Sequence, residues 1–122
     1  MSHTARIIAL AGSTRQQSFN RQLVALAARG ARSADTEVSI VDLGDFALPL
    51  FDPDDELAHG LPEAARTLKH LLMDSHGLLI ASPEYNSSVT GLLKNTIDWV
   101  SRSEKEDPYP LAAFRDKVVA LM

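Results

Sequence analysis

Four short apolar runs, separated by stretches with helical periodicity, constrain this chain to an alternating strand–helix fold. The runs are residues 6–11, 37–43, 77–82 and 117–122. The intervening segments 21–33, 62 onward and 91–103 place apolar residues three and four positions apart, as one face of a helix does. Parallel strands joined by right-handed helical crossovers produce this order. The pattern predicts an α/β fold in which helices cover both faces of a parallel sheet.

The connections between these elements are polar. The segment 44–60 holds two prolines and an acidic run at 52–56, which lacks the spacing of a calcium loop, so we expect a solvated loop there. Pro62 suits the first position of the next helix. Within 91–103, Lys94, Asp98 and Arg102 are spaced for two ion pairs along one helix face.

The last run, 117–122, carries no polar side chain after Lys117. Strands with this composition are usually covered on both faces inside a parallel sheet. We therefore expect it to be an interior strand, followed beyond Met122 by a further strand and helix. On this view residues 1–122 form a single domain that is incomplete at its C-terminus.

Composition argues against several classes of function. The 122 residues suffice for one core, and a net charge of −4 argues against general nucleic-acid binding. No apolar run approaches the roughly 20 residues that span a bilayer, so we expect no membrane association and a cytoplasmic location. Cysteine is absent, and the four histidines show no ligand spacing, so no metal site is predicted.

The first candidate site is the segment 12–20, Gly-Ser-Thr-Arg-Gln-Gln-Ser-Phe-Asn, between the first strand and first helix. A helix N-terminus offers unpaired N–H groups to a phosphate, and Arg15 adds a guanidinium suited to it. Gly12 tolerates unusual backbone angles and lets a ligand approach. The glycines of a Walker A or dinucleotide motif are missing. A polar turn with a capping serine and a surface arginine remains the alternative.

The second candidate site is the segment 82–86, Ser-Pro-Glu-Tyr-Asn, after the third strand. Backbone N–H groups here can meet the polar edge of a flat heterocycle, while Tyr85 adds an aromatic face and Asn86 both donates and accepts. The alternative is an exposed connection whose tyrosine packs on the protein. Glu84 has no histidine or second carboxylate nearby in sequence to complete an acid–base mechanism.

Both loops face one crevice if the first and third strands are neighbours. The flavodoxin-like strand order 2-1-3-4-5 makes them so, and ligands in such sheets bind at this switch point. A phosphate at one end and a flat ring at the other describe FMN.

The combined residues resemble a known family. They are Gly12-Ser13-x-Arg15-x-x-Ser18-x-Asn20, Pro83-Glu84-Tyr85-Asn86 and Gly91-x-Leu93-Lys94-Asn95-x-x-Asp98-Trp99. Together they are similar to the NADPH-dependent FMN reductases, which include chromate/quinone reductases and azoreductases. The resemblance covers essentially the whole chain. It implies a flavodoxin-like three-layer sandwich of sheet order 2-1-3-4(-5), here without the last strand and helix.

The resemblance also implies roles. The residues Ser13, Arg15, Ser18 and Asn20 would hold the FMN phosphate and ribityl end, and Pro83, Glu84, Tyr85, Asn86 and Ser87 would line the ring. Hydride would pass from NADPH or NADH through FMN to a small-molecule acceptor, namely a quinone, azo compound, chromate or free flavin. A homodimer or homotetramer is implied, with Trp99 either at the interface or simply buried. An electron carrier without turnover, or a relative that binds no flavin, remains the alternative.

Overall fold

The computed structural model describes residues 3–122, and these alternate strands and helices as expected. The elements are β1 (Arg6–Ala11), α1 (Phe19–Arg32), β2 (Glu37–Val41), the 3₁₀ turn η1 (Leu43–Asp45), α2 (Pro53–His59), α3 (Glu63–Met73), β3 (Gly77–Ala81), α4 (Gly91–Val100) and β4 (Val118–Leu121). The predicted strands and the three main helices are all present, with ends that shift by a few residues.

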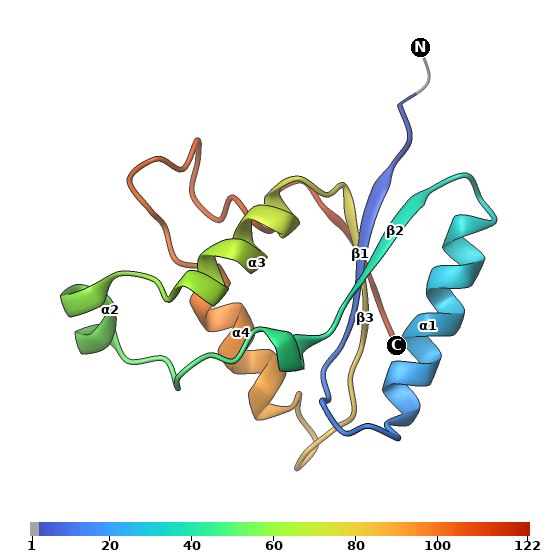
Figure 1. The fold of residues 1–122 in the computed structure, drawn as a ribbon, viewed down its shortest axis with the longest axis horizontal. Coiled ribbons are helices and arrows are strands. Elements are labelled where there is room, and N and C mark those ends of the chain that lie inside the picture. The colour runs from blue at the N-terminus through green and yellow to red at the C-terminus, as the bar shows by residue number, and fades with distance from the viewer. Residues whose placement is uncertain (1–2) are drawn as a thin grey trace.

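The four strands form one parallel sheet in the order β2-β1-β3-β4. Helix α1 covers one face of the sheet, and α3 and α4 cover the other (Figure 1). The flavodoxin-like three-layer architecture is therefore confirmed over the described residues. β1 lies between β2 and β3, so the loops that follow β1 and β3 leave the sheet at neighbouring positions.

Alternation along the central strands creates two different cores. Ile8 and Leu10 of β1 point toward α3 and α4, where they join the larger aliphatic cluster. Ala9 and Ala11 point to the opposite face, where they pack with Val24 and Ala28 of α1. The small side chains on this second face let α1 lie close to the sheet.

The segment 44–60 differs from its prediction, because it contains η1 and the helix α2. Asp52 caps α2 by accepting the backbone N–H of Asp54 at 2.9 Å, and Pro53 occupies the first turn. Acidic side chains in that turn favour the positive end of the helix. The residues predicted to form a solvated acidic loop are thus a capped helix start, although α2 does project away from the sheet (Figure 1).

This extra helix also changes an ion pair. Lys94 Nζ contacts Asp98 Oδ1 at 2.7 Å as predicted, whereas Arg102 Nε contacts Glu56 Oε2 at 2.7 Å instead of Asp98. The predicted Asp98–Arg102 pair is therefore wrong, because α2 brings a carboxylate to Arg102 from a distant part of the chain.

Strand β4 stands at the edge of the described sheet rather than in its interior. It pairs with β3, and all four of its residues are exposed, Val118 to 80% and Leu121 to 76%. The expected coverage on both faces is not present within residues 3–122. The strand and helix anticipated beyond Met122 stay a prediction.

Candidate functional site

Two hydrogen bonds join the start of the first candidate loop to the residues that flank the second. The backbone N–H of Gly12 donates to the carbonyl of Ala81 at 2.8 Å, and the buried hydroxyl of Thr90 donates to the carbonyl of Gly12 at 2.7 Å. Thr90 also caps α4 by accepting the N–H of Leu93 at 3.1 Å. The loop after β1 and the loop after β3 therefore form one continuous surface at the carboxyl ends of the strands.

The structure requires glycine at position 12 for its lack of a side chain, rather than for the unusual backbone angles that we expected. Its backbone is not in the left-handed region, so unusual angles do not explain the glycine. A Cβ at this position would lie 2.4 Å from Oγ and 2.9 Å from Cβ of Ser82. The glycine thus lets β1 and β3 end in close contact.

The first loop presents its predicted residues around the start of α1. Ser18 is buried and caps the helix, since its Oγ accepts the N–H groups of Asn20 and Arg21 at 3.2 and 3.4 Å. Ser13 Oγ accepts the N–H of Arg15 at 3.3 Å. Each hydroxyl still has its own O–H to donate. The side chain of Arg15 is exposed, and that of Asn20 is half-buried.

These features suit an anion. The first turn of α1 carries no acidic side chain, in contrast to α2. Among residues 3–122, no acceptor is paired with the backbone N–H groups of Gln16 and Gln17. Unpaired donors, the positive end of the helix dipole and a nearby guanidinium together favour a phosphate.

The second loop is a tight turn of fixed shape. Tyr85 and Ser88 exchange backbone hydrogen bonds of 2.9 and 3.2 Å, and Asn86 and Ser87 between them have φ values of 54° and 64°. Positive φ at both central residues defines a type I′ turn. The turn exposes 57% of Tyr85, and Glu84 is exposed beside it.

A cavity of about 320 Å³ lies beside this turn at the ends of β3 and β4. Pro83 and Glu84 line it together with the apolar side chains of Val89, Leu93 and Met122. Its size falls within the range of small-molecule sites. The structure therefore brings Pro83 and Glu84 to a concave surface, whereas Asn86 and Ser87 form the adjacent turn.

Sequence reasoning missed Thr90 and the apolar wall of this cavity. Thr90 precedes the helix that begins at Gly91, so its position before an apolar periodic segment indicated a cap. Its hydrogen bond to Gly12 could not be seen, because the two residues are far apart in sequence. The wall formed by Val89, Leu93 and Met122 depends on the pairing of β3 with β4 and carries no local signal.

Trp99 is buried within the chain itself. Its side chain is 1% exposed, its Nε1 donates to the carbonyl of Pro49 at 2.7 Å, and Phe51 packs edge-on against it at 4.9 Å between ring centroids. Of the two predicted roles, burial is the one that these contacts describe. Among residues 3–122, no three histidine, aspartate or glutamate side chains gather as a metal site would require.

Comparison with known proteins identifies relatives of this chain. The family described as NADPH-dependent FMN reductase matches residues 5–122. The chain is 44% identical over 97 residues to a 2-hydroxy-1,4-benzoquinone reductase of a Burkholderia species, covering 80% of this chain and 50% of that protein. It is 36% identical over 122 residues to a quinone reductase of Pseudomonas putida, covering 100% of this chain and 61% of that protein.

Solved structures agree with the fold. A flavoenzyme NAD(P)H:(acceptor) oxidoreductase from Paracoccus denitrificans superposes with a TM-score of 0.76 at 28% identity, covering 98% of this chain and 60% of that one. An azoreductase from Bacillus anthracis shares the fold with a TM-score of 0.67 at 19% identity, covering 97% and 67%. The chain spans about half the length of the curated relatives it matches.

Proposed function

Because the chain belongs to the NADPH-dependent FMN reductase family, we propose that residues 1–122 form one FMN-binding domain of an NAD(P)H-dependent oxidoreductase. The family description names FMN and NADPH, and relatives are named quinone reductases. The acceptor in this proposal is a small molecule, with a quinone favoured over the azo compounds, chromate and free flavin that such a site also admits.

One observation carries the proposal: the loop after β1 and the loop after β3 are hydrogen-bonded into one surface. Gly12 is bonded both to Ala81 and to Thr90. The anion-binding helix start follows β1 at the β1/β3 switch point of the sheet, and the apolar cavity beside the second loop lies at the adjoining ends of β3 and β4. A phosphorylated flat heterocycle needs these two surfaces at once.

The phosphate would lie at the start of α1. Within residues 3–122, the hydroxyl oxygens of Ser13 and Ser18 only accept hydrogen bonds, from backbone N–H groups. Each hydroxyl therefore still has its O–H to donate to a phosphate oxygen. Arg15 would supply the positive charge, and Asn20 a further donor. Both are solvent-accessible and can adjust to the ligand.

The ring would lie against the second loop, in contact with Pro83, Glu84, Tyr85, Asn86 and Ser87. The type I′ turn fixes the two central amides, which have no acceptor among residues 3–122 and could meet the polar edge of the ring. Bound FMN supplies the hydride-accepting and hydride-donating chemistry. The protein contributes position and a surface that excludes water, so we assign no side chain as acid or base.

Turnover distinguishes this proposal from an FMN-binding electron carrier. The relatives' names describe reductases, which supports catalysis. The test is steady-state oxidation of NADPH, followed by absorbance, with FMN and 1,4-benzoquinone present. We expect turnover that depends on both. A protein that binds FMN yet oxidises no NADPH would overturn the enzyme and leave the carrier.

Assembly and location belong to the same proposal. A homodimer or homotetramer and a cytoplasmic location rest on the family resemblance. No helix within residues 3–122 has the length and apolar character to cross a membrane. Light scattering during size-exclusion chromatography tests the assembly, and a monomer at all concentrations would contradict it.

A further inference from the structure

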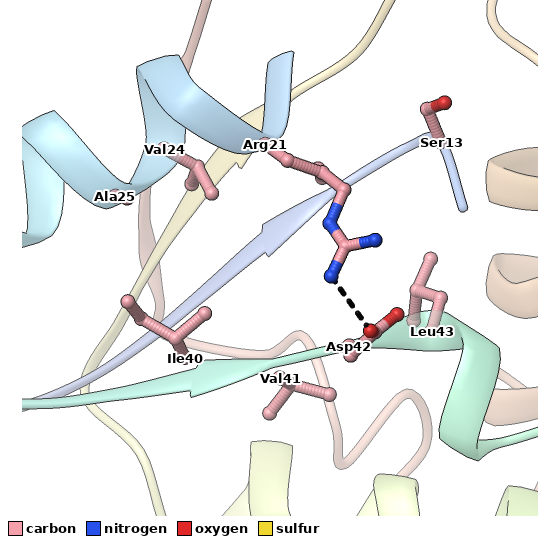
Figure 2. A pocket seen from close by; sticks show the side chains of 9 residues that line it. Ser13, Arg21, Val24, Ala25, Ile40, Val41, Asp42 and Leu43 are labelled. Atoms are coloured by element: carbon pink, nitrogen blue, oxygen red, sulfur yellow. Dashed lines mark hydrogen bonds and ion pairs between the residues drawn. The ribbon is translucent and has the colours of Figure 1, made fainter. Parts of the chain in front are cut away.

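A second cavity opens on the other side of the phosphate-binding loop from the ring cavity. It has a volume of about 200 Å³ and lies between the first turns of α1 and the end of β2 (Figure 2). Its walls are apolar, formed by Val24 and Ala25 of α1, by Ile40 of β2 and by Leu43 of η1. The family resemblance assigned no role to this cavity.

An ion pair lines this cavity. Arg21 Nη2 contacts Asp42 Oδ2 at 3.0 Å, and both side chains are about one-third exposed, at 36% and 37% (Figure 2). Asp42 Oδ1 accepts the backbone N–H of Gly44 at 2.9 Å. These bonds hold both groups in place but do not saturate them, because a carboxylate has about four acceptor sites and a guanidinium has five N–H donors.

The order of the sheet places three surfaces in a row. The ring cavity lies at the ends of β3 and β4, the phosphate loop follows β1, and the Arg21–Asp42 cavity lies at the end of β2. Ser13 belongs to the phosphate loop and also lines the Arg21–Asp42 cavity. A ligand with its phosphate at this loop could therefore extend in either direction.

The chemistry of the cavity matches a nucleoside. The carboxylate of Asp42 at the end of β2 can accept hydrogen bonds from the hydroxyls of a ribose, and the guanidinium of Arg21 can donate to a phosphate. The apolar walls offer a surface for a base, and the volume is too small for a whole dinucleotide. A bare ion pair that only ties η1 to α1 would not need the cavity beside it.

We propose that the Arg21–Asp42 cavity binds the adenosine phosphate half of a dinucleotide. The two sources are NAD(P)H and FAD, and the choice between them rests on the proposed reductase function. Asp42 accepts hydrogen bonds from the ribose, and Arg21 contacts the phosphate. The cavity thus extends the site beyond FMN itself.

The direct test uses 5′-AMP as the probe. The full chain, with FMN in excess, is titrated with 5′-AMP and followed by ¹H–¹⁵N NMR. We expect saturable shifts at Ser13, Arg21 and the β2 end. Arg21→Gln and Asp42→Asn should each weaken the affinity about tenfold, as the loss of a charged hydrogen bond predicts. In Asp42→Asn the side-chain amide oxygen can still accept the Gly44 N–H, so the turn is kept.

Arg29→Gln is the matched control, because Arg29 lies on the same helix outside the cavity and the substitution removes the same charge. It should leave 5′-AMP binding unchanged. No saturable shifts, shifts confined to residues 82–88, or an equal loss in all three variants would overturn the inference and leave a structural ion pair only.

Two further measurements identify the source. If NAD(P)H is the dinucleotide, Asp42→Asn raises its KM about tenfold and leaves kcat and FMN affinity unchanged. If FAD is the dinucleotide, the wild type binds it more tightly than FMN, and Asp42→Asn removes the difference. Either pattern supports the cavity. NADPH oxidation without 5′-AMP binding would refute the cavity alone, whereas 5′-AMP binding without NADPH oxidation would refute the reductase proposal alone.

Discussion

The hydroxyl of Thr90 donates a 2.7 Å hydrogen bond to the carbonyl of Gly12, across 78 positions of sequence. The same oxygen accepts the N–H of Leu93 at the start of α4. One buried side chain thus caps a helix and fixes the first ligand loop to it. The two halves of the proposed flavin site depend on each other through this group.

Thr90→Val should therefore destabilise the protein. The substitution keeps the shape but leaves a buried carbonyl and a helix N–H without their partner, at a cost of about 1–3 kcal/mol. Urea denaturation followed by circular dichroism measures the change. Thr90→Ser keeps the hydroxyl and should lose less. A valine variant as stable as the wild type, with a loss confined to serine, would show that the methyl group, not the hydrogen bond, matters.

Gly12→Ala should destabilise through a steric clash. Its Cβ would meet the side chain of Ser82 at 2.4 and 2.9 Å, and overpacking of this kind costs about 1–3 kcal/mol. Gly30→Ala is the control, since a Cβ there meets nothing within 4 Å and alanine favours a helix by about 0.5–1 kcal/mol. Thermal unfolding should separate the two in sign, and Ser82→Gly should partly rescue Gly12→Ala. A Gly12→Ala protein as stable as wild type would contradict the close contact.

Arg15→Ala should weaken FMN binding without affecting riboflavin. Removal of a charged hydrogen bond to phosphate predicts a loss of roughly 10- to 100-fold for FMN. Quenching of flavin fluorescence measures both affinities. Arg29→Ala, which removes an arginine from the far end of α1, should change neither. Equal losses for FMN and riboflavin in Arg15→Ala would refute the phosphate assignment.

At acidic pH, protonation of Asp107 in the segment after α4 should lower the stability of the protein. Burial raises the pKa of this carboxyl, but the hydrogen bonds from Lys69 Nζ and the Glu104 N–H, with the charges of Lys69 and His70, lower the pKa overall. Lys69 is 1% exposed and contacts Asp107 at 2.6 Å. A depressed folded pKa stabilises the protein above the ordinary carboxyl pKa of about 3.9, and this is lost as the pH falls through the folded value.

The unfolding free energy of Asp107→Asn should consequently depend less on pH below about 4 than that of the wild type. Asp98→Asn removes a carboxylate from the exposed Lys94–Asp98 pair and serves as the control, which should keep the wild-type slope. Denaturation series between neutral and acidic pH provide the measurement. Identical slopes for all three proteins would exclude Asp107 as the acid-sensitive group.

The sequence by itself determined the fold class and the position of both loops. Apolar runs of strand length and helical spacing are local patterns, so β1, β3 and α4 could be recognised from neighbouring residues alone. Ser18 directly precedes a segment of helical spacing, so its role as the cap of α1 also follows from neighbouring residues. The segment 52–56 also held a local signal, because Asp52-Pro53 is typical of a helix start. We predicted a solvated loop there instead because the segment is so acidic.

Only the tertiary structure decided how distant groups meet. The contact of Gly12 with Ser82, the bond from Thr90 to Gly12 and the pair of Arg21 with Asp42 each join residues that no periodicity connects. The chain's return through the sheet creates them, because parallel strands bring their carboxyl ends to one edge while their sequences lie far apart. Local propensity therefore defined the loops, and packing of the sheet defined the site.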